Sequence, residues 1–240
     1  MTFSIIPATT TLTLLTALTS LLLLVVLRFI ALLPYSTRPQ PPPRQSSHPR
    51  KAPCKICIIL GSGGHTSEML RMLDTLPTER YSPRCYVVAE SDTGSGDKAV
   101  AYEKARADDT GITNNIIVPA YTIHKIPRAR SVHQSYLTTP LSFLRAAYAS
   151  AQLLFTLRPD IMISNGPGTA LPMLLLAFLT RILPLPERIW RPPRLLYVES
   201  WARVKRLSMT GRICWWFVDR FLVQWEMPGM KGVEFVGRVV

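Results

Sequence analysis

The stretch that most constrains the fold is a glycine-rich loop between an apolar run and a helix-forming segment. It reads Ile58-Ile59-Leu60-Gly61-Ser62-Gly63-Gly64-His65-Thr66-Ser67-Glu68-Met69-Leu70. Glycines allow a sharp turn and bring backbone N–H groups close to a ligand. The helix that follows offers unpaired donors and partial positive charge at its N-terminus. The pattern therefore predicts a strand, a loop and a helix that bind a phosphate or diphosphate, with a ligand-free tight turn as the alternative.

The N-terminal segment, residues 1–33, is apolar and long enough to cross a bilayer. No charged side chain occurs before Arg28, and leucine, valine and alanine dominate residues 12–27. About 20 apolar residues span the hydrocarbon core, and an arginine near the end of a span can reach the headgroups. A cleaved signal peptide is the alternative, but the basic start typical of such peptides is missing. The segment is therefore predicted to be a retained transmembrane anchor.

Positive charge follows this segment and sets its expected orientation. Arg28, Arg38, Arg44 and Arg50 come after the apolar core, and nothing basic precedes it. Basic residues tend to stay on the cytosolic side of a span, so the rest of the chain is expected in the cytosol. The net charge of +13 fits contact with anionic lipid or a phosphorylated substrate. No recognisable base-reading module is present, so nucleic acid is not an expected partner.

Residues 34–53 form a proline-rich linker between the anchor and a globular part at 54–240. Seven prolines in this stretch favour extended polyproline II over a packed core. The chain has four cysteines, Cys54, Cys57, Cys85 and Cys214. They are too few and too scattered for a disulfide framework, which fits a reducing cytosolic environment. Cys54 and Cys57 lack a second ligand pair, so neither a zinc nor a redox role is expected for them.

Beyond the linker, short apolar runs alternate with longer amphipathic stretches. The predicted strands are 55–60, 84–89, 115–118, 160–164, 195–199 and 217–223. The predicted helices are 65–76, 97–107, 140–157, 169–182 and 208–216. Alternation of strands and helices indicates a parallel sheet, so the expected fold class is α/β, a single Rossmann-like domain preceded by one transmembrane helix. The apolar stretch 171–183 is broken by proline and arginine, which favours a buried helix over membrane contact.

Ligands bind at the carboxyl ends of the strands in an open parallel sheet. The loops expected at that edge are 61–65, 90–96, 119–134, 165–169 and 199–203. One of them, Asn165-Gly166-Pro167-Gly168-Thr169, is a second glycine loop that precedes a predicted helix. Two such loops at one edge indicate a diphosphate cleft, and a plain turn is the alternative for the second loop.

The candidate binding residues come from these two loops and one nearby cation. They are Gly61, Ser62, Gly63, Gly64, Thr66, Asn165, Gly166, Gly168 and Arg203. Two candidates for acid–base chemistry are His65, which can exchange a proton near neutral pH, and Glu199, which follows a predicted strand. Capping or solvent-facing roles are their alternatives. Nothing visible requires a metal or a cofactor, and no D-x-D motif occurs in a plausible site.

The first glycine loop also approaches the dinucleotide fingerprint G-x-G-x-x-G, with Thr66 in place of the last glycine. Glu90, at the end of the second predicted strand, resembles the acid that holds a ribose hydroxyl in that fold. A membrane-anchored NAD(P)-dependent oxidoreductase acting alone is therefore an alternative function.

Four motifs together resemble a known family. They are Gly61-Ser-Gly-Gly-His-Thr-Ser-Glu-Met-Leu70, Ser164-Asn-Gly-Pro-Gly-Thr169, Tyr197-Val-Glu-Ser200 and Gly237-Arg-Val-Val240. With the anchor, they look like the membrane-anchoring subunit of the eukaryotic UDP-N-acetylglucosamine (UDP-GlcNAc) transferase of asparagine-linked glycosylation. The resemblance runs from about Lys55 to the C-terminus.

The resemblance implies a heteromeric enzyme at the cytosolic face of the endoplasmic reticulum membrane, with the outer nuclear membrane as a further candidate location. Its reaction adds the second GlcNAc, from UDP-GlcNAc, to GlcNAc-diphosphodolichol. The anchored subunit resembles the acceptor half of a GT-B glycosyltransferase such as bacterial MurG. A separate soluble subunit resembles the donor half and is regarded as catalytic, so the anchored chain is expected to be inactive without it.

One strand end departs from the bacterial pattern. MurG-like enzymes carry a His-Glu-Gln-Asn run where this chain has Val198-Glu199-Ser200-Trp201, so only Glu199 carries over. The expected mechanism is direct displacement, in which the acceptor C4 hydroxyl attacks C1 of the donor sugar, UDP leaves, and His65 is the base. The chain has residues for one Rossmann-like half, so Trp215–Val240 is the expected docking tail for the partner. A pure scaffold, whose glycine loops are only turns, is a further alternative.

Overall fold

The computed structural model describes residues 8–33, 52–109, 121–130, 134–135, 137–183 and 186–237. Two compact units emerge from the contacts within the chain, Met1–Leu33 and Pro34–Val240.

The first unit is the helix α1 (Ala8–Leu32). Its 25 residues extend over about 38 Å, which exceeds the hydrocarbon thickness of a bilayer of about 30 Å. The hydroxyls of Thr13, Thr16 and Thr19 each donate to the carbonyl three residues earlier, at 2.9, 3.0 and 2.9 Å. These polar groups are therefore satisfied within the helix, as a lipid environment requires. Residues Leu15–Leu32 meet the length and composition of a membrane span, so the expected apolar helix is present.

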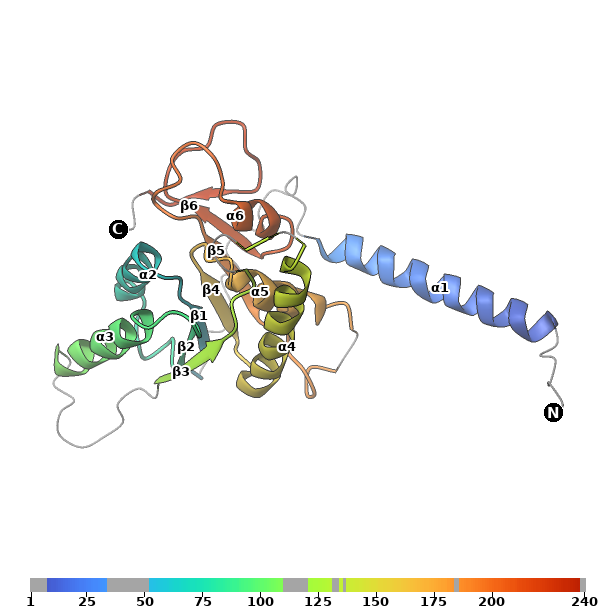
Figure 1. Cartoon of the computed structure of the whole chain (residues 1–240), viewed down its shortest axis with the longest axis horizontal. Helices are drawn as coiled ribbons and strands as arrows, with labels where there is room; N and C mark the ends of the chain where they lie inside the picture. The colour runs from blue at the N-terminus through green and yellow to red at the C-terminus, as the bar shows by residue number, and fades with distance from the viewer. Residues whose placement is uncertain are drawn as a thin grey trace. The chain divides into compact units, whose positions relative to one another are not determined.

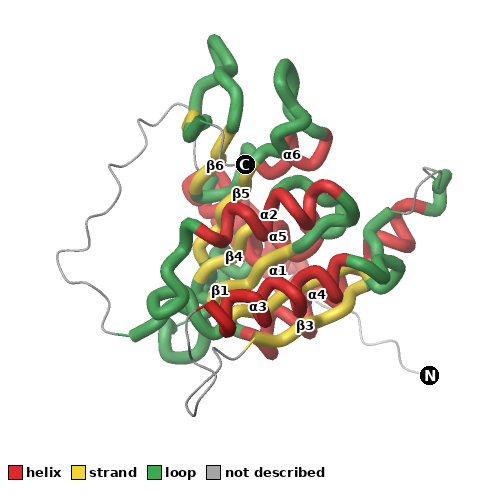
Figure 2. The backbone as a smooth tube through the Cα atoms, turned by 90° about the vertical axis from the view of Figure 1, so that its left-hand side faces the viewer, coloured by secondary structure: helices red, strands yellow, loops and turns green. Residues whose placement is uncertain are grey.

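The second unit is a seven-stranded sheet with helices on both faces (Figures 1 and 2). Its strands are β1 (Ile56–Ile59), β2 (Arg84–Ala89), β3 (Tyr121–Ile126), β4 (Ile161–Ser164), β5 (Arg194–Val198), β6 (Arg220–Val223) and β7 (Glu234–Phe235). Its helices are α2 (Gly64–Asp74), α3 (Ser95–Asp109), α4 (Thr139–Leu157), α5 (Ala170–Leu179) and α6 (Met209–Cys214). The strand order is β3-β2-β1-β4-β5-β6-β7, and every pair is parallel. The expected Rossmann-like α/β fold is confirmed.

Two helix layers enclose the sheet. Figure 1 shows α2 and α3 on one face, and α4, α5 and α6 on the other. Every residue of β1 and β2 is buried, because strands of a parallel sheet are covered on both faces. Ile58, Met69, Leu73 and Tyr86 belong to the core between β1, β2 and α2. The four cysteines are free and buried.

Two strands were not anticipated from the sequence. Residues 119–134 were expected to form one loop, which is wrong because β3 occupies Tyr121–Ile126 and pairs with β2. This edge strand is only partly buried and carries Thr122, His124 and Lys125, so it lacks the apolar run that marks its neighbours. The strand predicted at 115–118 lies outside the described residues. The other missed strand, β7, has only two residues.

The apolar stretch expected as a buried helix is α5. Its residues Ala170, Met173, Leu174, Ala177 and Phe178 are fully buried beneath α4 and against the sheet. The prediction of a buried helix at this position is therefore confirmed.

Asp92 organises the turn between β2 and α3. Its carboxylate accepts hydrogen bonds from Gly94 N at 3.2 Å, Ser95 N at 3.1 Å and Ser95 Oγ at 2.6 Å. Burial tends to raise the pKa of Asp92, but these hydrogen bonds and the charge of Arg128 outweigh it and lower the pKa below its usual value. The ionised carboxylate is thus the form that the fold favours.

Replacing Asp92 with alanine should cost about 1 kcal/mol of stability at pH 7, as for other lost helix-start acceptors. The pKa of Asp92 is lower in the folded chain than in the unfolded chain. Its carboxylate therefore stabilises the fold fully at pH values above the unfolded pKa, and this stabilisation is lost as the pH falls through the folded pKa. Denaturant unfolding of both proteins at pH 7 and near pH 3 checks this. The difference in unfolding free energy between the two proteins should be smaller near pH 3 than at pH 7. The same difference at both pH values would contradict the assignment.

Candidate functional site

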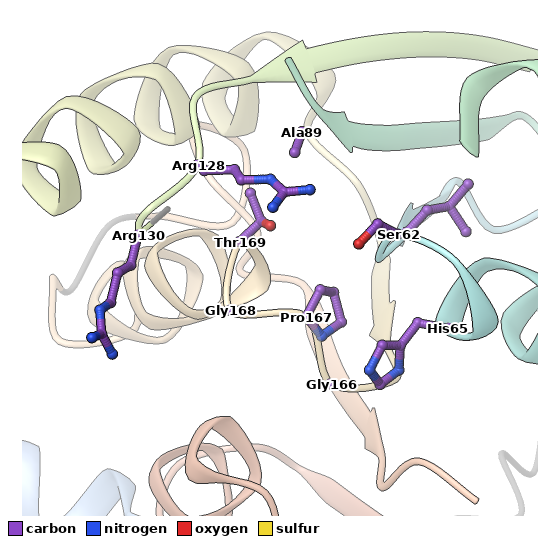
Figure 3. A pocket seen from close by; sticks show the side chains of 10 residues that line it. Ser62, His65, Ala89, Arg128, Arg130, Gly166, Pro167, Gly168 and Thr169 are labelled. Atoms are coloured by element: carbon purple, nitrogen blue, oxygen red, sulfur yellow. The ribbon is translucent and has the colours of Figure 1, made fainter. Parts of the chain in front are cut away.

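The predicted loops meet at the carboxyl edge of the sheet around a pocket of about 230 Å³ (Figure 3). Residues that follow β1, β3 and β4 contribute to it, together with Ala89 at the end of β2. The lining residues are Leu60, Ser62, His65, Ala89, Arg128, Arg130, Gly166, Pro167, Gly168 and Thr169. Both glycine loops are therefore part of one site, as the sequence predicted for a shared cleft.

Two helices begin at this pocket with their N-terminal donors uncapped by side chains. Gly63 precedes α2 with φ 66°, a backbone conformation that favours glycine, and no side chain caps the helix. Thr169 precedes α5, and no side-chain cap bond is formed there either, but Ala170 N and Leu171 N donate to the carbonyls of Pro167 and Gly168. The N–H groups at the start of α2 and the positive ends of both helices favour an anion in the space between them.

A cation strengthens this preference. Figure 3 shows the Arg128 side chain extending into the pocket, whereas Arg130 points away from it. Arg130 instead donates from Nη2 to the carbonyl of Gln134 at 3.1 Å. A guanidinium beside two helix N-termini is suited to a phosphate, which it can contact with two parallel hydrogen bonds. The sequence-based candidates did not include Arg128, because the strand that places it was not recognised.

His65 lies over the second glycine loop. Gly166 has φ 115°, and a Cβ at this position would lie 3.3 Å from His65 Cε1. The imidazole Nδ1 is 3.9 Å from Glu68 Oε2 and forms no hydrogen bond with any described residue. The ring is only partly buried and faces the pocket (Figure 3). His65 is thus positioned where it can exchange a proton with a bound ligand.

Gly61 sets the distance between the two loops. A Cβ at Gly61 would lie 2.9 Å from His65 Cβ and 2.9 Å from Pro167 Cβ. Both neighbours belong to pocket walls whose backbones are fixed by α2 and α5. Only glycine fits between them.

Replacing Gly61 with alanine should destabilise the domain by about 1–3 kcal/mol, the usual cost of overpacking a buried site. Gly64 is the matched control, because a Cβ there meets nothing within 4 Å and it begins α2. Alanine at Gly64 should be neutral or slightly stabilising, since alanine is the better helix former. Chemical unfolding of the two variants checks this, and equal stabilities would refute the packing argument.

Thr66 and Asn165 hold the loops together and do not line the pocket. The buried Thr66 hydroxyl donates to the carbonyl of Gly61 and lies 2.6 Å from Ser95 Oγ. Asn165 is fully buried and donates from Nδ2 to the carbonyl of His65 at 2.7 Å. Both residues therefore support the backbone that presents the site.

Glu68, which sequence analysis did not single out, joins four segments of the carboxyl edge. Its buried carboxylate accepts from Trp201 N at 2.6 Å and from Gln224 Nε2 at 2.6 Å. It also accepts from Ser200 Oγ at 3.0 Å and from Asn165 Nδ2 at 3.3 Å. One carboxylate thus connects α2 to the segments that follow β4, β5 and β6.

The side chain of Glu199, which follows β5, contacts Ser208 at the start of α6 and does not line the pocket. Its carboxylate accepts from Ser208 N at 3.0 Å, Ser208 Oγ at 3.2 Å and Ser200 N at 3.2 Å. Burial raises the pKa of Glu199, although these hydrogen bonds and the charge of Arg203 act in the opposite direction. This geometry matches the capping alternative. Arg203 is exposed and is likewise outside the pocket.

Of the predicted site residues, those in the pocket come from the glycine loops. Ser62, His65, Gly166 and Gly168 line it directly. Gly61, Gly63, Gly64, Thr66 and Asn165 shape the loops around it, and Glu199 and Arg203 lie elsewhere on the same edge.

Comparisons with known proteins agree closely with one another. The family model described as "Oligosaccharide biosynthesis protein Alg14 like" matches residues 56–239. The UDP-N-acetylglucosamine transferase subunit ALG14 of Rattus norvegicus is 40% identical over 187 residues, covering 77% of this chain and 82% of the relative. Relatives of the same name from Cryptococcus neoformans and Schizosaccharomyces pombe are each 39% identical. They cover 84% and 77% of this chain and 84% and 82% of their own lengths.

Among solved structures, MurG of Acinetobacter baumannii superposes with a TM-score of 0.50 at 14% sequence identity. The match covers 75% of this chain and 44% of the MurG chain, so this chain spans less than half of MurG. At this identity the likeness concerns the fold alone. None of these comparisons supports the oxidoreductase alternative. By its family model and its relatives, the chain belongs to the Alg14-like family of oligosaccharide biosynthesis proteins.

Proposed function

We propose that this chain is the membrane-anchoring, acceptor-side subunit of a UDP-GlcNAc transferase. In this role it helps add the second GlcNAc to GlcNAc-diphosphodolichol at the cytosolic face of the endoplasmic reticulum. The observation that carries the proposal is the pocket between two glycine loops, in a chain whose relatives are named as subunits of such a transferase. The apolar helix α1 supports the anchoring role by its length and composition.

The pocket is the proposed site for the diphosphate of the lipid-linked acceptor. The uncapped start of α2 supplies backbone donors, the N-terminus of α5 adds partial positive charge, and Arg128 supplies a cation on the opposite wall. A diphosphate carries negative charge that these groups can share, and the donors need no rearrangement to reach it. Gly61, Ser62, Gly63, Gly64, Gly166 and Gly168 keep the walls small enough for the backbone to approach the ligand.

His65 is the proposed general base. In this scheme the acceptor C4 hydroxyl forms a bond to C1 of the donor sugar while the bond from C1 to the UDP oxygen breaks. The hydroxyl proton passes to His65, and the configuration at C1 inverts. The partial exposure of the ring, which borders the pocket, supports this assignment. Nδ1 is buried 3.9 Å from Glu68 Oε2, so Nε2 is the nitrogen that would accept the proton. A catalytic role for Glu199 stays a prediction, since its carboxylate is engaged at the start of α6.

The donor half of the active site is proposed to come from a soluble catalytic subunit, without which this chain is inactive. Trp215–Val240 is the proposed docking region. Trp216 and Phe235 support it, since they are 56% and 53% exposed and Phe235 belongs to the edge strand β7. Large exposed apolar side chains at a sheet edge are typical of protein interfaces. The coverage of 44% of MurG fits a chain that supplies one of two halves.

Anchoring raises the effective concentration of the acceptor. A dolichol-linked substrate is confined to the bilayer, and a span at Leu15–Leu32 would confine this chain to the same surface. The basic residues after the span favour placement of the pocket on the cytosolic side.

Co-expression of the full chain with the candidate soluble subunit tests the proposal. The detergent-solubilised complex should transfer labelled GlcNAc from UDP-GlcNAc to a GlcNAc-diphospholipid, and neither subunit should do so alone. Transfer by this chain alone would contradict the need for a partner. Retention of NAD(P) by the purified chain, without any transfer by the complex, would instead favour the oxidoreductase.

Replacing Arg128 with alanine should lower kcat/KM for the diphospholipid acceptor by about 10-fold to 100-fold, mainly through KM. The reason is the loss of a charge-assisted hydrogen bond, which contributes about 1.5–3 kcal/mol. Arg130→Ala is the matched control, because Arg130 is two residues away and also borders the pocket, but its guanidinium points away and donates to the carbonyl of Gln134. Steady-state kinetics of the assembled complex check this. Equal losses in the two variants would indicate a general charge effect and not a phosphate contact.

A further inference from the structure

The helix α4 is apolar on two opposite faces, and only one of them is covered. Ala146, Leu154 and Leu157 are buried on the inner face. On the outer face, Leu141, Leu144, Tyr148 and Phe155 are exposed. We refer to these four exposed residues as the α4 stripe. A surface helix normally carries polar residues on its outer face, so this arrangement requires an explanation.

The α4 stripe follows one side of the helix, with the exposed Gln152 between Tyr148 and Phe155. At 3.6 residues per turn, its members at positions i, i+3, i+7 and i+14 fall on one side of the helix. Leu141, Leu144 and Tyr148 are 75%, 65% and 69% exposed. Leu137, in the turn just before the helix, is 92% exposed and extends the apolar surface. Phe155 packs against the ring of Trp190, with 4.7 Å between ring centroids, and is 49% exposed, so the most exposed part of the row is its N-terminal end.

The charge along the segment of sequence that carries the α4 stripe is of one sign. Residues 110–159 contain no aspartate or glutamate, but they contain one lysine and four arginines. Arg145 is exposed one turn after Leu141, and Arg158 is exposed just beyond the end of α4. A protein partner could bind an apolar row that is flanked by charges of either sign. An anionic lipid surface, by contrast, favours a row flanked by basic residues without acidic neighbours.

We infer that the α4 stripe lies in the interface of an anionic lipid membrane, as a second contact besides the anchor. Apolar side chains enter the boundary of the acyl chains, Tyr148 lies at headgroup level, and the arginines pair with lipid phosphates. The inference rests on the membrane anchoring proposed for α1, and not on the transfer chemistry. A domain already held at the bilayer needs only a weak contact of this kind to be oriented.

This placement differs from the segment that the sequence singled out. The apolar stretch 171–183 is more hydrophobic than α4, but the helix α5 that it forms is buried in the domain. The stripe on α4 becomes visible only when the buried half of that helix is separated from its exposed half.

A fluorophore attached at Leu144→Cys in the full chain, reconstituted into liposomes of phosphatidylcholine and phosphatidylserine, tests the inference. Ala105→Cys is the matched control, since Ala105 is exposed on α3, which covers the opposite face of the sheet (Figure 1). The native cysteines are buried, which limits labelling to the introduced thiol. Quenching by brominated lipid should be about threefold or more stronger at position 144 than at position 105, and weaker when phosphatidylserine is left out.

Flotation of the chain with the liposomes separates this inference from the anchor itself. Flotation with equal lipid quenching at the two positions would overturn the inference and leave the anchor intact. Failure to float would overturn the anchor and the inference together. Protection of position 144 from aqueous iodide only after addition of the soluble subunit would also overturn it, in favour of a protein interface. A label at Tyr148→Cys repeats the measurement if Leu144→Cys unfolds, as judged by circular dichroism.

Discussion

Replacing Glu68 with alanine is expected to destabilise the domain by about 3–4 kcal/mol. The substitution leaves the buried Ser200 Oγ and the partly buried Trp201 N without their acceptor. It also removes one acceptor each from Asn165 and Gln224. A buried donor that loses its partner costs about 1–3 kcal/mol, and the losses occur together at one point. Guanidinium chloride unfolding of the purified chain in detergent measures the change.

Glu90→Ala is the control for this experiment. Glu90 is an acid at the same edge of the sheet, but its side chain is exposed, so its loss should change stability by less than about 0.5 kcal/mol. A loss below about 1 kcal/mol in Glu68→Ala would show that water replaces the missing carboxylate, and the network would then not be what holds the edge together.

The strands of the sheet centre could be predicted from sequence because parallel strands are buried on both faces. Ile56–Ile59 and Arg84–Ala89 read as apolar runs, and both were placed to within a residue or two. The edge strand β3 pairs with β2, and only Ile126 of its six residues is fully buried, so its polar residues made it look like a loop. Local pattern thus identifies a strand where burial is uniform and fails at the edge of the sheet.

The glycine loops of the site could also be predicted, because the residues that form each loop are consecutive in the sequence. A strand followed by glycines and a helix creates an anion site from the backbone alone, and the pocket includes both predicted loops. Arg128 and Glu68 could not be predicted in the same way. Arg128 was one cation among 28, and its role depends on the position of β3. Glu68 looks like an acid in the first turns of a helix, and its partners lie up to 156 positions away in sequence.

The two residues act on the site at different levels. Arg128 contributes charge to the pocket, whereas Glu68 fixes the segments after β4, β5 and β6 relative to α2. Because Asn165 donates both to Glu68 and to the carbonyl of His65, the same network supports the backbone that carries the imidazole. The position of His65 therefore depends on the hydrogen bonds that join α2 to the segments after β4, β5 and β6.

Replacing His65 with glutamine is expected to lower kcat of the assembled complex by about 100-fold or more, the contribution typical of a positioned general base. Glutamine keeps a similar volume over Gly166, so the neighbouring loop should remain in place. The loss should fall on kcat more than on KM, because the backbone donors and Arg128 that would hold the diphosphate are unchanged. Steady-state transfer kinetics of the two complexes at pH 7 measure kcat and KM separately.

His124→Gln is the matched control for this substitution. His124 lies on β3 away from the pocket lining, and its Nε2 is 2.9 Å from Thr122 Oγ1. Burial and the charge of Lys55 lower the pKa of His124, so it is mostly neutral at pH 7 and its replacement should leave kcat unchanged. Both variants should still bind the soluble subunit in a pull-down, because neither residue lies in the proposed docking region. Full transfer by His65→Gln with the partner bound would reject His65 as the base and favour the scaffold hypothesis, in which the glycine loops are turns and the partner supplies the chemistry.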